Sequence, residues 1–251
     1  MQRQHPLPTL EELKDYYETS YRAGLYQQFA DAREMKRLTA AARWRAVRPY
    51  VSSGTWLDVG CADGVFLAEL AWHNVDATGI DLSEVAVNKA KERGHSAHCE
   101  TIAEHRPAKP YDVISAFDVL EHVLDPRDFL SAVRRLLKPG GTLVLSTPNL
   151  RSFSRLIMGR RWYFYIPEEH LFYFAPHSLK LLLDNTGFEL VARKSVGKPL
   201  TFDYSLTQFE QYNPLIHRIL KAGGALLPRR MRELSVPLHI GEMLAVAKRT
   251  N

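Results

Sequence analysis

Short apolar runs alternate with helix-like segments through the middle of the chain. Four runs rich in β-branched and aromatic residues lie at 55–59, 76–81, 111–117 and 141–147. Strands separated by helical segments are typical of βαβ units. The pattern therefore predicts an α/β fold with a mainly parallel sheet, and two later β-type runs, at residues 188–196 and 241–249, extend it.

Two of the helical segments have readable ends. Ser83, followed by Glu84, is typical of a helix start, and Gly94 is typical of the end of the same helix. Pro126 opens the other segment, and Pro139 with two glycines after it is expected to stop that helix.

The first 50 residues have a different texture from the rest. Residues 9–50 are rich in Ala, Arg, Leu and Tyr and contain one glycine, which predicts helices. We therefore expect an N-terminal helical lid over residues 1–50 and an α/β domain over residues 51–251.

Composition and charge exclude few classes of protein, and they indicate an ordinary globular one. Of the 251 residues, 45% are hydrophobic and 24% are charged, and the net charge is +5. The basic residues are spread along the chain, so a nucleic-acid partner is not indicated. No signal peptide or apolar membrane span is visible, which makes a cytoplasmic location the default expectation. Cys61 and Cys99 lack the spacing of a zinc site and are expected to be thiols.

A glycine turn follows the first β-type run. Gly60 and Gly64 lie between the run and a helical segment, where small residues let a ligand approach the backbone and the helix N-terminus. An NAD-type GxGxxG motif would need further glycines where Ala62 and Val65 stand, so NAD is disfavoured. Asp81 ends the next run and follows Gly60 by 21 positions. This is close to the spacing at which an acidic residue binds the ribose hydroxyls in a Rossmann-type unit. Together these features favour a nucleoside-containing ligand.

The motifs LDVGCADG, GID, YDVISAFDVLEHV and LLKPGGTLVLSTPN follow one another between Thr55 and Val196. In this order they resemble the class I S-adenosylmethionine-dependent methyltransferases, and most of all the ubiquinone-biosynthesis O-methyltransferases. The resemblance implies a Rossmann-like seven-stranded sheet in which only the last strand is antiparallel, with helices on both faces. It also implies acceptor-side insertions, which we expect at about 150–175 and 198–239.

The resemblance also implies which residues bind S-adenosyl-L-methionine. Asp58 and Gly60 would face the methionine part, Asp81 the ribose, and Glu100 with the two residues after it the adenine edge. The full set implied is Asp58, Gly60, Ala62, Gly64, Asp81, Leu82, Thr101, Ile102 and Phe117. Ala62 departs from the family, which has glycine there. Arg37 and Arg43 are both candidates for the N-terminal arginine that helps to hold the cofactor in the family.

Acidic and imidazole side chains follow the strand predicted at residues 111–117. In the ubiquinone-biosynthesis O-methyltransferases that the chain resembles, a Glu-x-x-Glu-His pattern there binds a divalent cation. In this chain Asp118, Glu121 and His122 stand at those positions, so the resemblance implies a metal site. His170 is a candidate fourth ligand of Mg²⁺ or another divalent cation. Two alternatives remain: His122 or His170 acts as a base without metal, or the cluster shapes the loop and caps the next helix.

The predicted acceptor region is aromatic. The aromatic residues of the first insertion are Trp162, Tyr163, Phe164, Tyr165, Phe172, Tyr173 and Phe174. They are expected either to form a wall over an apolar acceptor or to pack under a loop, and Arg160 and Arg161 could meet an anionic acceptor. Residues 213–234 carry apolar pairs beside basic residues, such as Leu226-Leu227, so they form a lid or dimer helix or a helix that contacts a membrane or lipid-linked substrate.

The function expected is methylation of a small-molecule hydroxyl, such as a catechol or quinone precursor, a sugar or a natural product. Two alternatives are an RNA 2′-O-methyltransferase and a cofactor-binding pseudoenzyme that regulates a partner. The first lacks a visible RNA-binding module. The second leaves the acidic, imidazole and aromatic acceptor-side residues without a role.

Overall fold

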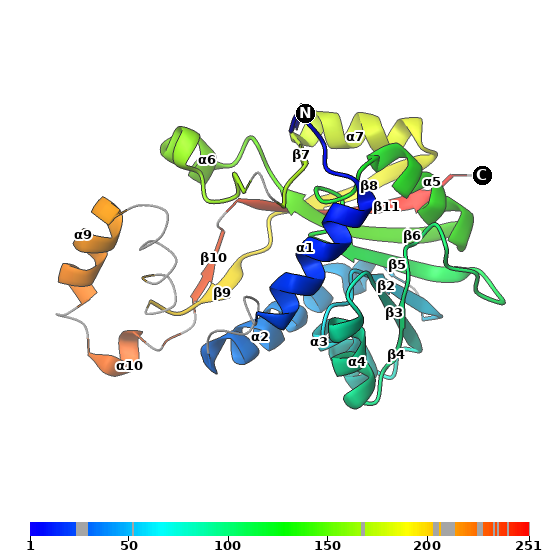
Figure 1. The fold of residues 1–251 in the computed structure, drawn as a ribbon, viewed down its shortest axis with the longest axis horizontal. Coiled ribbons are helices and arrows are strands. Elements are labelled where there is room, and N and C mark those ends of the chain that lie inside the picture. The colour runs from blue at the N-terminus through cyan, green and yellow to red at the C-terminus, as the bar shows by residue number, and fades with distance from the viewer. Residues whose placement is uncertain are drawn as a thin grey trace.

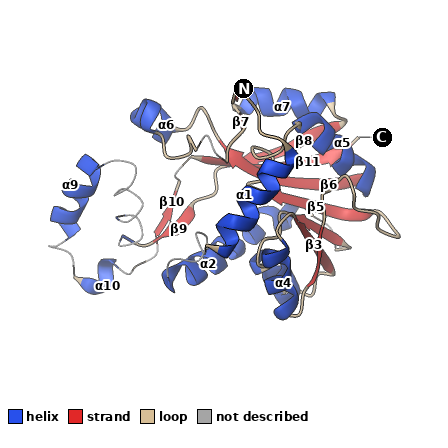
Figure 2. Ribbon diagram, in the orientation of Figure 1, coloured by secondary structure: helices blue, strands red, loops and turns tan. Residues whose placement is uncertain are grey.

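In the computed structural model, a seven-stranded sheet forms the centre of the chain (Figures 1 and 2). Its strands are β2 (Trp56–Val59), β3 (Ala77–Asp81), β4 (Ser96–Cys99), β5 (Tyr111–Phe117), β6 (Leu137–Pro148), β8 (Phe188–Lys194) and β11 (Glu242–Arg249). They lie in the order β4-β3-β2-β5-β6-β11-β8. The pairs from β4 to β6 are parallel, and β11 runs antiparallel to both of its neighbours. The predicted Rossmann-like sheet with its last strand reversed is confirmed.

The structure describes residues 1–23, 30–51, 53–166, 169–202, 206, 214–224, 228–232, 234, 236–239 and 241–250. The longer helices in these ranges are α1 (Leu10–Arg22), α2 (Ala30–Val47), α3 (Val65–Trp72), α4 (Glu84–Glu92), α5 (Pro126–Leu136), α7 (Pro176–Asn185) and α9 (Pro214–Gly224). The short ones are η1 (Arg48–Tyr50), α6 (Phe153–Met158), η2 (Gly159–Arg161) and α10 (Arg229–Arg232).

Helices cover both faces of the sheet. α2 and α3 pack on one face, and α5 and α7 pack on the other. The side chains of β5 alternate between the two: Val113 and Phe117 join the core under α2 and α3, while Ile114 and Ala116 join the core under α5 and α7. Because both faces are buried, β5 reads in the sequence as a mostly apolar run.

The N-terminal 50 residues contain α1 and α2, as predicted for residues 9–50, of which 24–29 lie outside the described residues. α1 begins with a capping box, in which the Glu12 amide donates to the Thr9 hydroxyl and the Thr9 amide donates to the Glu12 carboxylate. Leu13 buries its side chain in the main core. Figure 1 shows α1 crossing in front of the sheet, where it covers the ends of several strands.

One helix end differs from the prediction. The helix from Pro126 was expected to continue to Pro139, but α5 ends at Leu136 and β6 begins at Leu137. Leu137 pairs with Tyr111, and the next pair joins Thr142 to Val113, so residues 138–141 form a bulge rather than a helix end.

Two smaller sheets involve the segments expected to be insertions, and one of them also takes a strand from the N-terminus. β1 (Gln2–Arg3) pairs with β7 (Phe172–Tyr173), and β9 (Lys198–Leu200) pairs with β10 (Val236–Leu238). α9 and α10 lie at the left of Figure 1, away from the main sheet. The predicted apolar pair Leu226-Leu227 lies outside the described residues.

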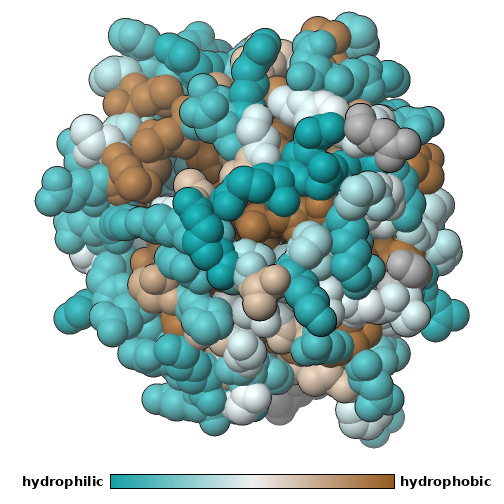
Figure 3. All heavy atoms as spheres, turned by 90° about the vertical axis from the view of Figure 1, so that its right-hand side faces the viewer, coloured by the Kyte–Doolittle hydropathy of each residue, from teal (hydrophilic) through white to brown (hydrophobic). Residues whose placement is uncertain are grey.

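Polar side chains cover most of the face that Figure 3 shows, with smaller apolar patches between them. Of the helices that the described residues form, none is long and apolar enough to cross a bilayer.

Candidate active site

The parallel strands bring the predicted cofactor residues to one edge of the sheet. β2, β3, β4 and β5 end at Val59, Asp81, Cys99 and Phe117, and the carboxyl ends of parallel strands share an edge. The glycine turn after β2 needs left-handed backbone: Gly60 has φ 72° and Ala62 has φ 49°. A left-handed alanine costs about 1 kcal/mol, which is the physical reason for glycine at this position in the family.

Asp81 holds the turn in place. One carboxylate oxygen accepts from the Ala62 amide (2.9 Å) and the other from the Ser83 amide (3.0 Å). Burial raises the pKa of Asp81, and these amide bonds oppose the rise. Each carboxylate oxygen can accept further hydrogen bonds, so Asp81 can still bind a diol at the strand end.

A groove of about 800 Å³ opens between α1 and the ends of β3 and β4. Leu82, Glu84 and Cys99 line its sheet side, and residues of α1 line the other. The predicted adenine-edge residues lie in the turn that follows β4. There Ile102 is buried, and Thr101 donates from its amide and its hydroxyl to Glu104.

Asp58 is buried beneath the glycine turn, with its residue 3% exposed. The Ser115 hydroxyl donates to it at 2.5 Å, and the Trp56 indole N–H donates to Ser115 at 2.7 Å. Burial raises the pKa of Asp58 to about 7, against the lowering effects of Ser115 and the Arg43 charge. A carboxylate that is costly to ionise here gains from a bound ammonium group, such as that of a methionine moiety.

The Asp58 pKa predicts a pH-dependent stability for the cofactor-free protein. The unfolded state loses this proton near pH 4 and the folded state near pH 7, so the free energy of unfolding falls as the pH rises through this window, by up to about 4 kcal/mol. Asp58→Asn keeps an acceptor for Ser115 and should remove this part of the slope. Urea unfolding of both proteins from pH 5 to pH 8 measures how the free energy of unfolding depends on pH. If this dependence has the same slope in both proteins, it does not come from Asp58.

The structure distinguishes the two arginine candidates. Arg43 lies over the Phe117 ring at 4.7 Å and forms an ion pair with Asp118. Arg37 is exposed and pairs with Glu34 on its own helix. Arg43 therefore reaches the strand ends, whereas Arg37 does not.

Asp118 acts as an anchor for the loop after β5. Its backbone is left-handed, with φ 56°, a strained conformation for a non-glycine residue. Its carboxylate accepts from Ser146 (2.6 Å), pairs with Arg43, and lies 3.7 Å from the Lys198 ammonium. Burial would raise the pKa of Asp118, but the two cations outweigh it and hold the pKa far below its usual range.

Three other side chains form a compact donor group. Glu121, His122 and His170 each place one ligand atom within 4.8 Å of the others. Glu121 is 1% exposed, and neither of its carboxylate oxygens has a hydrogen-bond partner of good geometry among the described residues, although the Thr147 hydroxyl lies close enough to lower its pKa. Burial, together with the charge of Asp118, raises the pKa of Glu121 well above its ordinary value. Asp118, predicted as a ligand with Glu121 and His122, lies outside this group, and His170 takes its place.

The backbone holds this group together. The Leu171 and Phe172 amides both donate to the Glu121 carbonyl, so the segment carrying His170 is fixed to the loop after β5. His170 Nδ1 donates to the Phe164 carbonyl at 2.7 Å, which leaves its Nε2 with the lone pair. Burial lowers the pKa of both imidazoles, that of His122 to about 3, so both are neutral near pH 7.

The aromatic residues of the first insertion divide into two groups. Phe172 and Phe174 belong to the main core of the sheet, so they form no part of a wall. Trp162, Phe164 and Tyr173 form a separate cluster, with Tyr163 and Tyr165 against it. Arg160 and Arg161 are exposed in η2.

A family model described as a methyltransferase domain matches residues 26–193 of the chain. The chain belongs to the methyltransferase family. A curated relative named ubiquinone biosynthesis O-methyltransferase, from Methylococcus capsulatus, is 33% identical over 60% of this chain and 70% of its own length. One of the same name from Vibrio atlanticus is 32% identical over 64% and 74%.

Solved methyltransferases share the fold. Magnesium protoporphyrin IX methyltransferase from Synechocystis with bound S-adenosylmethionine has a TM-score of 0.60 at 15% identity, covering 97% of this chain and all of its own. A 1,6-didemethyltoxoflavin-N1-methyltransferase from Burkholderia thailandensis with bound S-adenosylhomocysteine has a TM-score of 0.61 at 15% identity, covering 98% and 92%. The methyltransferase uses S-adenosylmethionine, and the buried Asp58, the left-handed turn and Asp81 fit such a cofactor.

Three residues that contact the candidate site of the methyltransferase were not predicted from the sequence. The Tyr17 hydroxyl bonds to His122 Nδ1 at 2.8 Å, and Lys198 forms an ion pair with Glu242 beside Asp118. Glu242 could have been singled out from the sequence, because an acid at the start of an otherwise apolar strand is expected to have a buried partner. Nothing local distinguishes Tyr17 from the other tyrosines of α1.

Proposed function

We propose that this methyltransferase transfers the methyl group of S-adenosylmethionine to a hydroxyl of a small molecule. The observation that carries the proposal is the buried Glu121 beside two neutral imidazoles, in the loop that follows the cofactor residue Phe117. A hydroxyl must lose its proton when it attacks a methyl group, and this group of side chains can take it. The relatives from Methylococcus capsulatus and Vibrio atlanticus, both ubiquinone biosynthesis O-methyltransferases by name, support a hydroxyl acceptor such as a quinone precursor.

A divalent cation fits the same three residues. The unpartnered Glu121 oxygens and the Nε2 lone pair of His170 are ligand atoms, and His122 completes the set. Two imidazoles with one carboxylate suit a transition metal such as Mn²⁺ or Zn²⁺ better than Mg²⁺, which prefers oxygen ligands. A bound cation would lower the pKa of an acceptor hydroxyl.

The chain's own residues then have separate tasks. Asp58, Asp81 and Arg43 hold the cofactor, and Phe117 lies at its side. Asp118, fixed by Arg43 and Ser146, sets the start of the loop so that Glu121 and His122 face the acceptor. Exclusion of water by the bound acceptor would leave its hydroxyl as the nucleophile in line with the methyl group.

An apolar or lipid-linked acceptor is supported by an exposed apolar surface on α6, a helix that packs through Met158 against the aromatic cluster containing Phe164. α6 exposes Phe153, 76% accessible, with Leu156 and Ile157. Exposed apolar side chains of this size mark contact surfaces more often than chance, so a hydrophobic tail of the acceptor would find a surface there.

A turnover screen tests the proposal. Methyl transfer from labelled S-adenosylmethionine is measured with catechols, lipid-linked catechols, sugars and a small RNA duplex, each with and without EDTA. A methylated hydroxyl on a catechol, lipid-linked catechol or sugar supports the proposal, and turnover with RNA alone, or with none of them, contradicts it. Loss of turnover in EDTA that Mn²⁺ restores assigns the metal, and activity that EDTA leaves unchanged assigns the base alone.

A further inference from the structure

Three consecutive residues of α1 bond to three different loops of the site. The Tyr16 hydroxyl donates to Glu169 (2.9 Å), the Tyr17 hydroxyl bonds to His122 Nδ1 (2.8 Å), and Glu18 accepts from the Ser83 hydroxyl (2.9 Å). Ser83 follows the cofactor residue Asp81, and the other two partners lie at the acceptor group. One turn of this helix therefore joins the cofactor side to the acceptor side.

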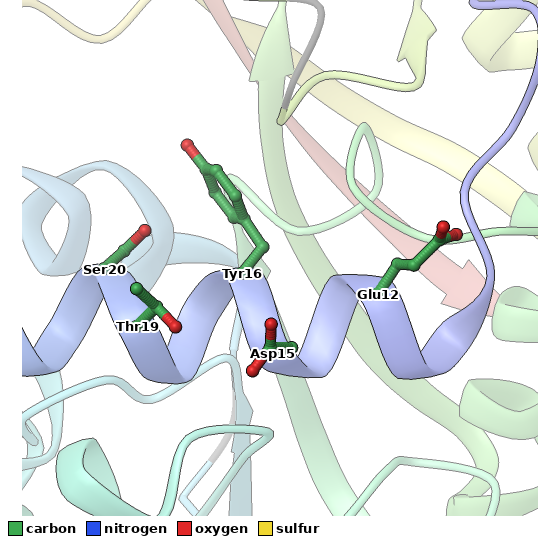
Figure 4. Close-up of a pocket in the computed structure, with 5 residues that line it drawn as sticks. All are labelled: Glu12, Asp15, Tyr16, Thr19 and Ser20. Atoms are coloured by element: carbon green, nitrogen blue, oxygen red, sulfur yellow. The ribbon is translucent and has the colours of Figure 1, made fainter.

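The helical geometry explains how neighbours in sequence reach such different partners. Successive residues of an α-helix project about 100° apart, so residues 16 to 18 spread over most of the circumference. Leu13, one turn before Tyr17, is buried in the main core, and Tyr17 packs against the same core. Figure 4 shows Tyr16 extending from α1 on the same side as Ser20, and both residues line a second pocket. The core contact of Leu13 fixes the rotation of α1 and so directs the Tyr17 hydroxyl to the site.

The bond from Tyr17 determines what His122 can do. The two rings meet edge to face, with centroids 6.1 Å apart, and the His122 ring also meets the His170 ring at 4.8 Å. With Nδ1 bound to the hydroxyl, the other nitrogen, Nε2, lies 4.0 Å from the Glu121 carboxylate, and the ring also hydrogen-bonds to the Glu169 backbone. Which nitrogen carries the proton depends on whether the hydroxyl donates or accepts.

We infer that Tyr17 is a positioning residue of the acceptor site, whose oxygen accepts the Nδ1 proton of His122 and thereby presents the Nε2 lone pair to the acceptor. This role rests on the proposed function, because both a base and a metal ligand need that lone pair. It gives α1 a task beyond covering the cofactor, since the acceptor group is complete only with the helix docked.

Tyr17→Phe tests the inference, because it keeps the ring and its packing on the core and removes the hydroxyl. We expect kcat to fall by roughly 10- to 100-fold, as for other residues that orient a ligand or base, with the KM for S-adenosylmethionine unchanged. Tyr16→Phe is the neighbouring variant for comparison: it removes the hydroxyl that meets Glu169 and leaves the bond between Tyr17 and His122 in place, so its loss in kcat should be at least about 3-fold smaller than that of Tyr17→Phe. Equal losses in the two variants, or a loss in KM for the cofactor alone, would overturn the inference.

A second measurement needs no acceptor and separates this inference from the proposed function. The ¹⁵N shifts of the His122 ring report its tautomer directly. The unmodified protein should show the proton on Nδ1, and Tyr17→Phe should show a mixture or a shift to Nε2. A ring that carries its proton on Nε2 in the unmodified protein would contradict the role of Tyr17, whereas a failed acceptor screen with the expected tautomer would contradict only the hydroxyl acceptor.

Discussion

Glu121→Gln is expected to reduce kcat for methyl transfer at least about 100-fold, the lower end of what general base catalysis contributes. Glutamine keeps the size of the side chain, and the Leu171 and Phe172 amides still bond to the backbone carbonyl of residue 121. The change removes the ionisable carboxyl group, which can take a proton or bind a cation once it is ionised. Initial rates with the acceptor found in the turnover screen measure the effect.

The same substitution should not destabilise the fold. A buried carboxylate without a hydrogen-bond partner costs free energy, so its neutral amide should leave the unfolding midpoint unchanged or raise it. Glu169→Gln is the matched control, because Glu169 lies next to His170 but bonds to Tyr16 instead of joining the donor group. An active Glu121→Gln protein, or equal losses in both variants, would show that Glu121 has no part in the chemistry.

Asp81→Asn should weaken S-adenosylmethionine binding about 100-fold. Two hydrogen bonds to a charged carboxylate contribute roughly 3 kcal/mol or more, and an asparagine can accept at one position only. Either the Ala62 amide or the Ser83 amide then loses its acceptor, so the glycine turn loosens as well. Calorimetric titration with S-adenosylmethionine and S-adenosylhomocysteine measures the loss.

Asp76→Asn provides the control for Asp81. It makes the same chemical change just before the same strand begins, where the side chain is exposed and far from the turn. Its affinity for the cofactor should match that of the unmodified protein. If both variants bind equally well, Asp81 serves only to brace the turn and the ribose contact is elsewhere.

The sheet could be predicted from the sequence because its signals are local. β5 extends from Tyr111 to Phe117, the bounds of the β-type run, since burial on both faces selects a mostly apolar series in which Asp112 and Ser115 are the exceptions. The end of α5 was placed too late because proline and glycine indicate that a helix stops without showing that a strand has already begun. The pairing of Leu137 with Tyr111 determines where the strand begins, and these two residues are far apart in the sequence.

The candidate site was predictable only in part for the same reason. Asp118, Glu121 and His122 stand together in the sequence, yet the fold separates them: Asp118 turns to Arg43 and Lys198, while Glu121 and His122 turn to His170. A carboxylate beside two cations becomes an anchor, and one without a partner becomes a reactive group. Spacing along the chain carries no information about which cations the fold will bring near.

The groove between α1 and the sheet also provides the protein with a natural reporter. The sequence has two cysteines; Cys61 is buried, and Cys99 is exposed and lines this groove opposite α1. A thiol-reactive fluorophore would therefore attach at one place in the unmodified chain, beside the helix that joins the two halves of the site. Its emission would follow the docking of α1 in real time, without an engineered label and without any acceptor present.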